Sequence, residues 1–208
     1  MNNPLKALRN IPVTAVTIAS LYPEIKDGIH KVMALEKSKQ IIRLKRGLYV
    51  VNQQLTGNMI STELIANHLC SPSYVSMETA LRHYGLIPEA VYLTRSMTLG
   101  RSRTFTNAYG TFEFRHASEK SFHIGITNGE CDGAYFMIAM PEKALCDLIA
   151  ETVGLNLRFL KETEEYLSDY LRFDMDALAD FNLDILREYA KVGKKKESIK
   201  TIIKLLER

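Results

Sequence analysis

The sequence has no tryptophan, only three cysteines in 208 residues, and no apolar run long enough to span a bilayer. A membrane-spanning helix needs about 20 apolar residues, so we expect none here. Cys70, Cys131 and Cys146 lie too far apart for a zinc motif, and their odd number argues against a disulfide framework. The first residues lack the apolar core of a secretory signal. These absences predict a cytoplasmic protein whose cysteines are small core residues.

The motifs of the common enzyme classes are also missing. The chain has no P-loop, no dinucleotide fingerprint, no Gly-x-Ser-x-Gly elbow and no His-Glu-x-x-His zinc motif. Asp174 and Asp176 resemble a metal-binding carboxylate pair, but they lie in a generally acidic segment, where solvated surface is the simpler interpretation. We therefore expect no catalytic residue, no metal and no cofactor.

The charged residues are segregated along the chain. Residues 1–51 carry nine lysines and arginines against three acidic residues, a net of +6, whereas residues 142–190 carry five against twelve, a net of −7. Residues 191–208 return to +5, with seven basic residues against two acidic ones. This segregation favours a basic module for a polyanion and an acidic body with a different partner, although blocks of like charge also simply keep a surface solvated.

Residues 1–51 have the pattern of a winged helix-turn-helix, a DNA-binding module. A first helix is expected from Pro12, which suits a first helical turn, to about Leu21. A second helix is expected over residues 24–38, with Ile29 and Val32 on an apolar inner wall and a polar, mostly basic outer wall. A recognition helix needs this division, because its inner face packs on the domain while its outer face enters the major groove.

A hairpin is predicted to follow over residues 40–51, with Arg46 beside a glycine at its tip. Guanidinium groups in such a hairpin suit phosphate oxygens or a narrow minor groove. The expected partner is therefore double-stranded DNA. The candidate DNA contacts are Lys26, His30, Lys31 and Lys37 on the helix, with Arg43, Lys45 and Arg46 on the hairpin.

The rest of the chain is expected to mix strands and helices. Ser76 is expected to cap a helix that Gly85 ends, and Pro141 is expected to open another. The cluster 194–196, three lysines, suits either an auxiliary phosphate contact or a solvated end. The predicted fold is thus α+β: a winged helix-turn-helix over residues 1–51, then a mixed α/β domain over 52–208 with a terminal helical segment. Its strands are expected at 91–93, 104–106, 111–114, 121–126 and 134–139, its acidic helices within 142–190 and its basic tail at 191–208.

These segments follow one another in an order that resembles a known family. The motifs that carry the resemblance are RLKRGLYVV at 43–51, PSYVSMETALRHYGLIPE at 72–89, RTFTNAYGTFEFRH at 103–116 and AMPEKALCDLI at 139–149. Over roughly residues 10–150 the chain resembles the AbiEi-type antitoxins of bacterial type IV toxin–antitoxin and abortive-infection systems.

The resemblance implies a two-part protein without catalytic activity. The winged helix-turn-helix would repress its own operon by binding promoter DNA, and the remainder would neutralise a nucleotidyltransferase-like toxin encoded next door. The family's DNA contacts would fall here on Lys31, Lys37, Arg43, Lys45 and Arg46. Two alternatives stay open: a winged-helix transcription regulator with a ligand-sensing or oligomerising C-terminal domain and no toxin, and an enzyme on nucleic acid or nucleotides with an unfamiliar site.

Overall fold

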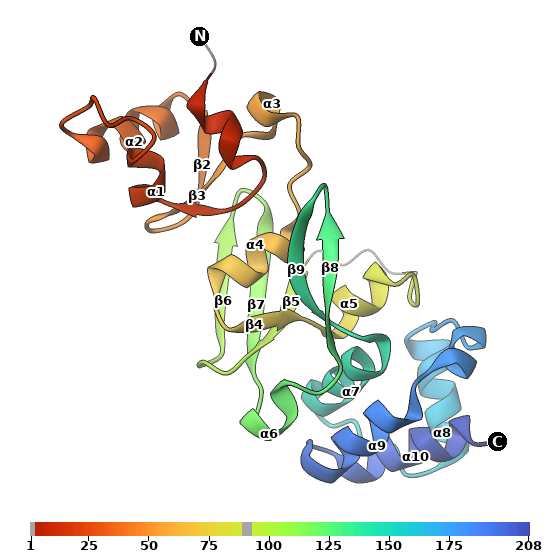
Figure 1. The fold of residues 1–208 in the computed structure, drawn as a ribbon. Coiled ribbons are helices and arrows are strands. Elements are labelled where there is room, and N and C mark those ends of the chain that lie inside the picture. Colours follow the sequence, from red (N-terminus) through yellow and green to blue (C-terminus); the bar gives the residue numbers. More distant parts are fainter. Residues whose placement is uncertain (1–2, 89–92) are drawn as a thin grey trace.

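The computed structural model describes residues 3–88 and 93–208 and shows a mixed α+β protein. Three parts follow one another along the molecule: an N-terminal module, a six-stranded central sheet and a C-terminal group of helices (Figure 1). The two chain ends lie at opposite ends of this arrangement. Within the described ranges, no helix has both the length and the apolar character that crossing a membrane requires.

The N-terminal module combines short helices with a small antiparallel sheet. Thr14 and Asp27 cap its two α-helices, since each side-chain oxygen accepts a hydrogen bond from the backbone N–H three residues further on. The sheet order is β1-β3-β2. The elements are η1 (Pro4–Leu8), β1 (Val13–Thr14), α1 (Ala15–Ala19), α2 (Gly28–Lys37), β2 (Ile41–Lys45) and β3 (Leu48–Val51).

Both predicted helices of this module begin later than expected. Pro12 is not helical, because the chain first pairs as β1 and α1 starts only after its cap, Thr14. The second helix starts at Gly28, where Asp27 satisfies a first-turn N–H, instead of at residue 24. Lys26 therefore lies in the loop before α2 and not on the helix.

The predicted hairpin is present, and its second strand, β3, is buried on both faces. Tyr49 and Val51 pack with η1, α1 and α2, whereas Leu48 and Val50 belong to the core of the central part. Side chains alternate between the two faces of a strand, so β3 contributes to two cores at once. The N-terminal module is thus packed directly against the rest of the protein.

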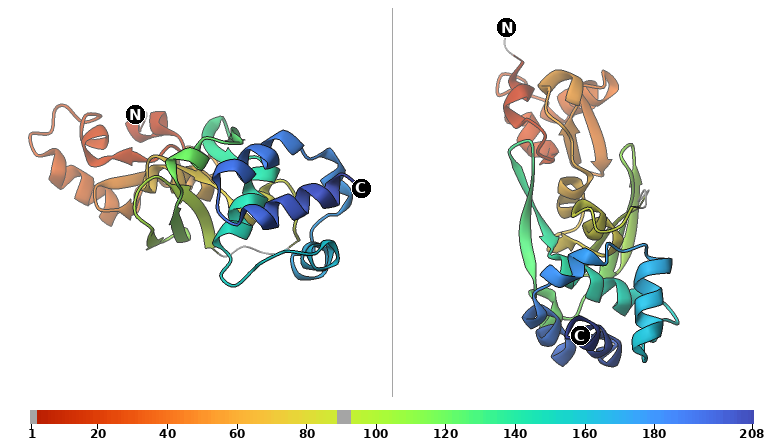
Figure 2. Two further views of the ribbon diagram at one scale, coloured as in Figure 1. Left: turned by 90° about the horizontal axis from the view of Figure 1, so that it is seen from below. Right: turned by 90° about the vertical axis from the view of Figure 1, so that its right-hand side faces the viewer.

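The central sheet has the strand order β6-β7-β5-β4-β9-β8. β4 pairs with β9 and β5 with β7 in parallel, and the other neighbours are antiparallel. The hairpins β6–β7 and β8–β9, one at each edge of the sheet, reach towards the N-terminal module on either side (Figure 2). The strands are β4 (Ser73–Val75), β5 (Leu93–Thr98), β6 (Arg103–Asn107), β7 (Gly110–His116), β8 (Ile126–Cys131) and β9 (Ala134–Ala139).

The tip of the β8–β9 hairpin is bonded to the N-terminal segments. Arg9 Nη2 donates to the Asp132 carbonyl at 2.9 Å, and the Asp132 carboxylate accepts from Asn58 Nδ2 and the Met59 N–H, both at 2.9 Å. These two bonds to the carboxylate lower the pKa of Asp132, because they stabilise its charged form. Asp132 and Gly133 both have positive φ, 51° and 74°, as a two-residue hairpin turn of the primed type requires.

Helices cover the sheet and form the C-terminal part. Nine of the eleven residues of α7 are buried, so this helix is the centre of that part. The segment η2 is a single π-helical turn. The helices are α3 (Gln53–Thr56), α4 (Thr62–Leu69), α5 (Met77–His83), α6 (Glu119–Phe122), α7 (Pro141–Glu151), α8 (Leu160–Glu165), η2 (Tyr166–Tyr170), η3 (Asp176–Asp180), α9 (Leu183–Val192) and α10 (Lys196–Leu206).

Most elements predicted after residue 52 are confirmed, but one segment predicted as a strand begins as a helix. The helices at 77–83 and from Pro141, the hairpin at 103–116 and the strand at 134–139 are all present. The strand predicted at 121–126 is wrong, because residues 119–122 form α6 with the Ser118 carbonyl accepting its first N–H groups, and β8 starts at Ile126. Residues 91 and 92 of another predicted strand lie outside the described residues, and β5 starts at Leu93.

The three lysines at 194–196 form bonds within the protein, and Lys194 and Lys196 are at the same time exposed to solvent. Lys194 Nζ lies 2.6 Å from Glu151 Oε1, Lys195 Nζ donates to the Thr152 carbonyl, and Lys196 Nζ donates to a backbone carbonyl of α9 at 2.5 Å. The first two bonds fasten the turn between α9 and α10 to the C-terminal end of α7, where free carbonyls favour cations, whereas the third joins α10 to α9.

Candidate nucleic-acid interface

α2 lies on the outer side of the N-terminal module (Figure 1). Val32 and Leu35, each 3% exposed, hold its inner side against a small core that includes Ile18 of α1. The opposite side of the helix faces solvent. Its exposed residues are Ile29, His30, Met33, Ala34 and Lys37.

Two large apolar side chains lie on this outer side, and one of them, Ile29, was expected on the inner wall. Ile29 is 74% exposed and Met33 is 56% exposed. α1 is only five residues long, so it covers only a narrow strip of α2 and leaves these two side chains in solvent. The outward face of α2 is therefore mixed, apolar in its first turns and basic in its last turn at Lys37.

Two of the predicted DNA contacts on this helix are engaged by neighbours. His30 Nδ1 lies 2.5 Å from Asp27 Oδ2, and the His30 N–H donates to the same carboxylate at 3.0 Å. The pKa of Asp27 is lowered, first by the His30 backbone hydrogen bond and then by the bond to its ring. Lys31 Nζ lies 4.5 Å from the centre of the Tyr22 ring, a cation–π contact.

Arg43 lies on the hairpin beside α2 and is paired with it. Its Nη2 lies 2.8 Å from Glu36 Oε2, and its guanidinium stands 5.7 Å from the centre of the Tyr49 ring. The pKa of Arg43 is raised, mainly by the hydrogen bond to Glu36. The side chain is still 51% exposed, so this guanidinium can reach a phosphate if it exchanges its partner.

Lys45 is the predicted DNA contact that the structure places elsewhere. Its Nζ donates to the Leu69 carbonyl at 2.7 Å and stands 5.7 Å from the centre of the Phe105 ring, both in the central part. Strict alternation along β2 predicted an outward side chain, but the register shifts between Arg43 and Lys45. Such a bulge re-aims the residues that follow it.

The three remaining predicted contacts are exposed cations. Lys26 precedes α2, Lys37 is in the last turn of α2, and Arg46 is in the turn between β2 and β3. None of the three forms a hydrogen bond or ion pair with another residue in the described part of the chain. The seven predicted DNA contacts therefore fall into three groups. Three are exposed cations without a partner in the described part of the chain, three contact neighbouring side chains at the surface, and one faces the central part.

A second group of side chains joins two of the sequence motifs, those at 72–89 and 139–149. The Asp147 carboxylate accepts from Ser76 Oγ at 2.8 Å, from the Tyr74 hydroxyl at 3.0 Å and from Lys143 Nζ at 2.8 Å. Lys143 Nζ also lies 4.5 Å from the centre of the Tyr189 ring. All five side chains belong to residues that are at most 3% exposed.

This constellation is structural, because burial denies a substrate access to it. The pKa of Tyr74 is raised by burial and then by the charge of Asp147, so the hydroxyl stays a donor, and Tyr189 is affected in the same way. Ser76 was expected to cap α5, but its hydroxyl bonds to Asp147 and makes no cap. The cluster instead joins β4, α7 and α9, which are far apart in the sequence.

Comparison with known proteins does not assign a function. A scan against protein-family models finds no match for this chain, and a search of curated proteins finds none either. Across residues 3–88 and 93–208, no three His, Cys, Asp or Glu side chains gather where they could hold a metal ion. Function is therefore argued from the geometry of the chain and from its motifs.

Proposed function

We propose that the N-terminal module is a winged helix-turn-helix that binds double-stranded DNA through α2. The order η1-β1-α1-α2-β2-β3 with the sheet order β1-β3-β2 supports this, since it is typical of such modules. The observation that carries the proposal is the free outer face of α2, whose inner face is fixed by Val32 and Leu35. A helix of about 10–12 Å diameter fits the B-DNA major groove, which is about 12 Å wide.

The cations around α2 suit the phosphates at the edges of that groove. Lys37 and Lys26 flank the outer face, and Arg43 and Arg46 extend from the neighbouring hairpin. Phosphate contacts fix the register of a protein on DNA, whereas contacts with base edges supply sequence preference. We assign the phosphate contacts to these four residues and exclude Lys45, which bonds to the central part.

We further propose that the chain is a cytoplasmic, non-catalytic antitoxin that represses its own operon and neutralises a nucleotidyltransferase-like toxin. The resemblance of its four motifs to AbiEi-type antitoxins supports this proposal. Two of these motifs meet in the buried cluster around Asp147, so they act as fold determinants, and the toxin-neutralising surface is expected elsewhere on residues 52–208.

DNA binding is tested with the full-length protein and the duplex upstream of its own gene, titrated at several salt concentrations. The variant Lys37→Ala with Arg46→Ala should bind more weakly and lower the salt slope by about two units, one for each phosphate that the variant no longer neutralises. The matched control removes two exposed cations of the other parts, Lys120→Ala with Lys204→Ala, and should bind as the wild type does. Equal binding by all three proteins would contradict the assignment.

The antitoxin activity is tested by co-expression with the reading frame next to the gene. Full-length protein should restore growth when that reading frame is toxic, and the Lys37→Ala with Arg46→Ala variant should restore it equally. Neutralisation is then separate from DNA binding. If the neighbouring product is a toxin and growth is not restored, the antitoxin proposal is wrong, and a transcription regulator without a toxin is the better explanation.

A further inference from the structure

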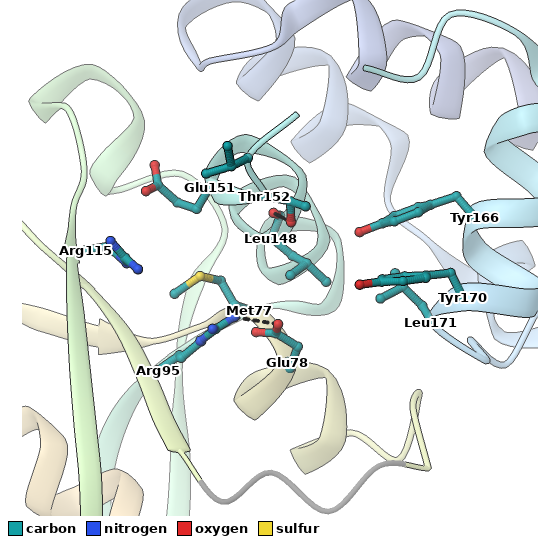
Figure 3. A pocket seen from close by; sticks show the side chains of 11 residues that line it. Met77, Glu78, Arg95, Arg115, Leu148, Glu151, Thr152, Tyr166, Tyr170 and Leu171 are labelled. Atoms are coloured by element: carbon teal, nitrogen blue, oxygen red, sulfur yellow. Dashed lines mark hydrogen bonds and ion pairs between the residues drawn. The ribbon is translucent and has the colours of Figure 1, made fainter. Parts of the chain in front are cut away.

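A pocket of about 350 Å³ lies where the central sheet meets the C-terminal helices (Figure 3). Arg95 and Arg115 reach it from the neighbouring strands β5 and β7, Leu148 forms part of its apolar lining, and Tyr166 and Tyr170 face it from η2. Its volume is within the range of about 300–1,000 Å³ that is typical of small-molecule sites. No motif identified in the sequence accounts for this pocket.

Four charged side chains form a row of ion pairs along one wall. Arg95 Nη1 lies 2.6 Å from Glu78 Oε1, Arg95 Nε lies 3.1 Å from Glu113 Oε2, and Arg115 Nη2 lies 2.5 Å from Glu113 Oε1. One terminal nitrogen of each guanidinium has no hydrogen-bond partner among the described residues. These nitrogens are Arg95 Nη2 and Arg115 Nη1. The row has no net charge, yet it offers free donors in the geometry that suits a carboxylate.

Two buried oxygens at the pocket lack hydrogen-bond partners. Glu78 Oε2 and the Tyr166 hydroxyl are shielded from solvent, and neither bonds to a described residue. Burial is the main cause that raises the pKa of Tyr166 to about 12, so its hydroxyl stays protonated and can donate. Glu78 Oε2 is therefore an acceptor, and the Tyr166 hydroxyl a donor, that can still form a hydrogen bond.

The backbone around the pocket is unusual in two places. Met77, whose side chain points into the pocket, has φ of 54°, a left-handed conformation that few residues other than glycine adopt. Tyr166 and Tyr170 stand on the π-helical turn, in which the Leu171 N–H bonds to the Tyr166 carbonyl at 3.0 Å. Both kinds of feature recur at functional sites, and here they border one cavity.

We propose that this pocket binds a free α-amino acid. The carboxylate of the amino acid accepts from the free guanidinium nitrogens, and its ammonium group donates to Glu78 Oε2. Its side chain lies against Met77 and Leu148. A zwitterion fits this lining better than a phosphate does, because Glu78 and Glu113 already balance the two arginines. Glu151, which pairs with Lys194, adds a further carboxylate to the lining.

The bound amino acid would connect η2 with the central sheet. Its carboxylate would lie at the two arginines on β5 and β7, and its side chain would extend towards the side of the pocket that Tyr166 and Tyr170 of η2 line. Binding should therefore stabilise the packing of the C-terminal helices, which gives a thermal readout. This proposal depends neither on DNA binding nor on a toxin partner, so its failure would leave the proposed function untouched.

The test uses the full-length protein in isothermal titration calorimetry and thermal unfolding. The twenty standard L-amino acids are added one at a time to about 10 mM, enough to detect a Kd of about 1 mM. Propionate, ethylamine and inorganic phosphate serve as probes that lack one of the two charges. At least one amino acid should bind and raise the melting temperature. Propionate, ethylamine and phosphate, which each carry charge of one sign only, should do neither. Failure of all twenty to bind, or equal binding by phosphate or propionate, would overturn the proposal.

Variants place the binding in the pocket. Arg115→Gln should weaken binding about tenfold or more, because it removes a hydrogen bond to the charged carboxylate. Arg101→Gln and Tyr135→Phe alter exposed residues outside the pocket and should bind as the wild type does. Without added amino acid, Tyr166→Phe should keep or raise the melting temperature, since it removes an unpaired buried hydroxyl. The Arg115 side chain is 45% exposed, so Arg115→Gln should keep the fold. Unchanged affinity for the amino acid in this variant would overturn the assignment.

Discussion

Lys143 and Asp147 lie one turn apart on α7 and form a fully buried ion pair, with 2.8 Å between Nζ and Oδ1 and side chains 0% and 1% exposed. The hydroxyls of Tyr74 and Ser76 satisfy the other carboxylate oxygen. An intact buried pair adds little net stability compared with apolar residues, but removing one partner leaves a buried charge without compensation. The pair therefore makes the packing of β4 on α7 sensitive to a single substitution.

Asp147→Asn should lower the free energy of unfolding by roughly 3–5 kcal/mol, because Lys143 stays buried without an opposite charge. Combining it with Lys143→Met should recover part of the loss, since no uncompensated charge remains. Urea unfolding followed by circular dichroism measures both effects. The exposed pair Lys161 and Glu165, with side chains 88% and 59% exposed, is the control, and its neutralisation should change stability little. An Asp147→Asn protein as stable as the wild type would show that Lys143 finds another partner.

The neighbours Lys45 and Arg46 should separate stability from DNA binding. Lys45→Met should lower stability by about 1 kcal/mol, because the variant has no charged donor for the Leu69 carbonyl, yet leave DNA affinity nearly unchanged. Arg46→Met should keep stability and weaken DNA binding at low salt. Both variants remove one positive charge from adjacent positions of the same hairpin, so each is the control for the other. The assignment is wrong if Lys45→Met weakens DNA binding as strongly as Arg46→Met does.

Asp132 should make the attachment of the β8–β9 hairpin to the N-terminal segments sensitive to acid. Its pKa in the folded protein is lowered from 3.8 by Asn58 and the Met59 N–H, so the folded state binds its proton less readily than the unfolded chain. The stabilisation is complete above pH 3.8 and disappears as the pH falls through the lowered value. Asp132→Asn should therefore be less stable than the wild type at pH 7, and the two should converge as the pH falls through the lowered pKa of Asp132.

Circular dichroism melts between pH 2 and pH 7 measure this convergence. Glu130→Gln, an exposed carboxylate on the same hairpin without a hydrogen bond to the N-terminal segments, is the matched control. It should follow the wild-type curve over the whole range. A difference between Asp132→Asn and the wild type that persists at pH 2 would show that the carboxylate charge is not what holds the hairpin.

Local chemistry allowed much of the secondary structure to be predicted. Pro141 opens α7 as expected, and Gly85 ends α5 with φ of 73°. The alternation in residues 41–51 predicted the β2–β3 hairpin. These features depend on backbone preferences that a residue has wherever it occurs, so one sequence suffices to predict them.

Tertiary contacts decided the features that the sequence did not predict. Helical spacing alone cannot tell that α1 is too short to cover Ile29. The Ser76 hydroxyl has two suitable partners, an N–H of its own helix and a carboxylate 71 residues away, and only the fold selects Asp147. A bulge turns Lys45 away from solvent, and the strand pattern gives no sign of it.

The amino-acid pocket was missed for a related reason. Arg95 and Glu113 face each other only because β5 and β7 are parallel neighbours in the sheet, although β6 lies between them in the sequence. Glu113 and Arg115 are two residues apart on β7, so they share a face, which is the signal that could have pointed to a charged wall. The spacing of Glu113 and Arg115 does not show that β5 is the strand beside them.

Ile29 and Met33 should set the sequence preference of DNA binding. Both are exposed on the face of α2 that we assign to the major groove, where an apolar side chain gains most from a thymine methyl group. Ile29→Ser with Met33→Ser should reduce the affinity for the best-bound promoter duplex about tenfold, since each of the two side chains loses the burial of about one methylene-sized group, at roughly 0.8 kcal/mol each. Binding to a duplex without thymine methyl groups, made with uracil, should change little. Val16→Ser, at a 78% exposed position on α1, is the control and should leave both affinities unchanged. Equal reductions on the thymine and uracil duplexes would show that these side chains do not contact base methyl groups.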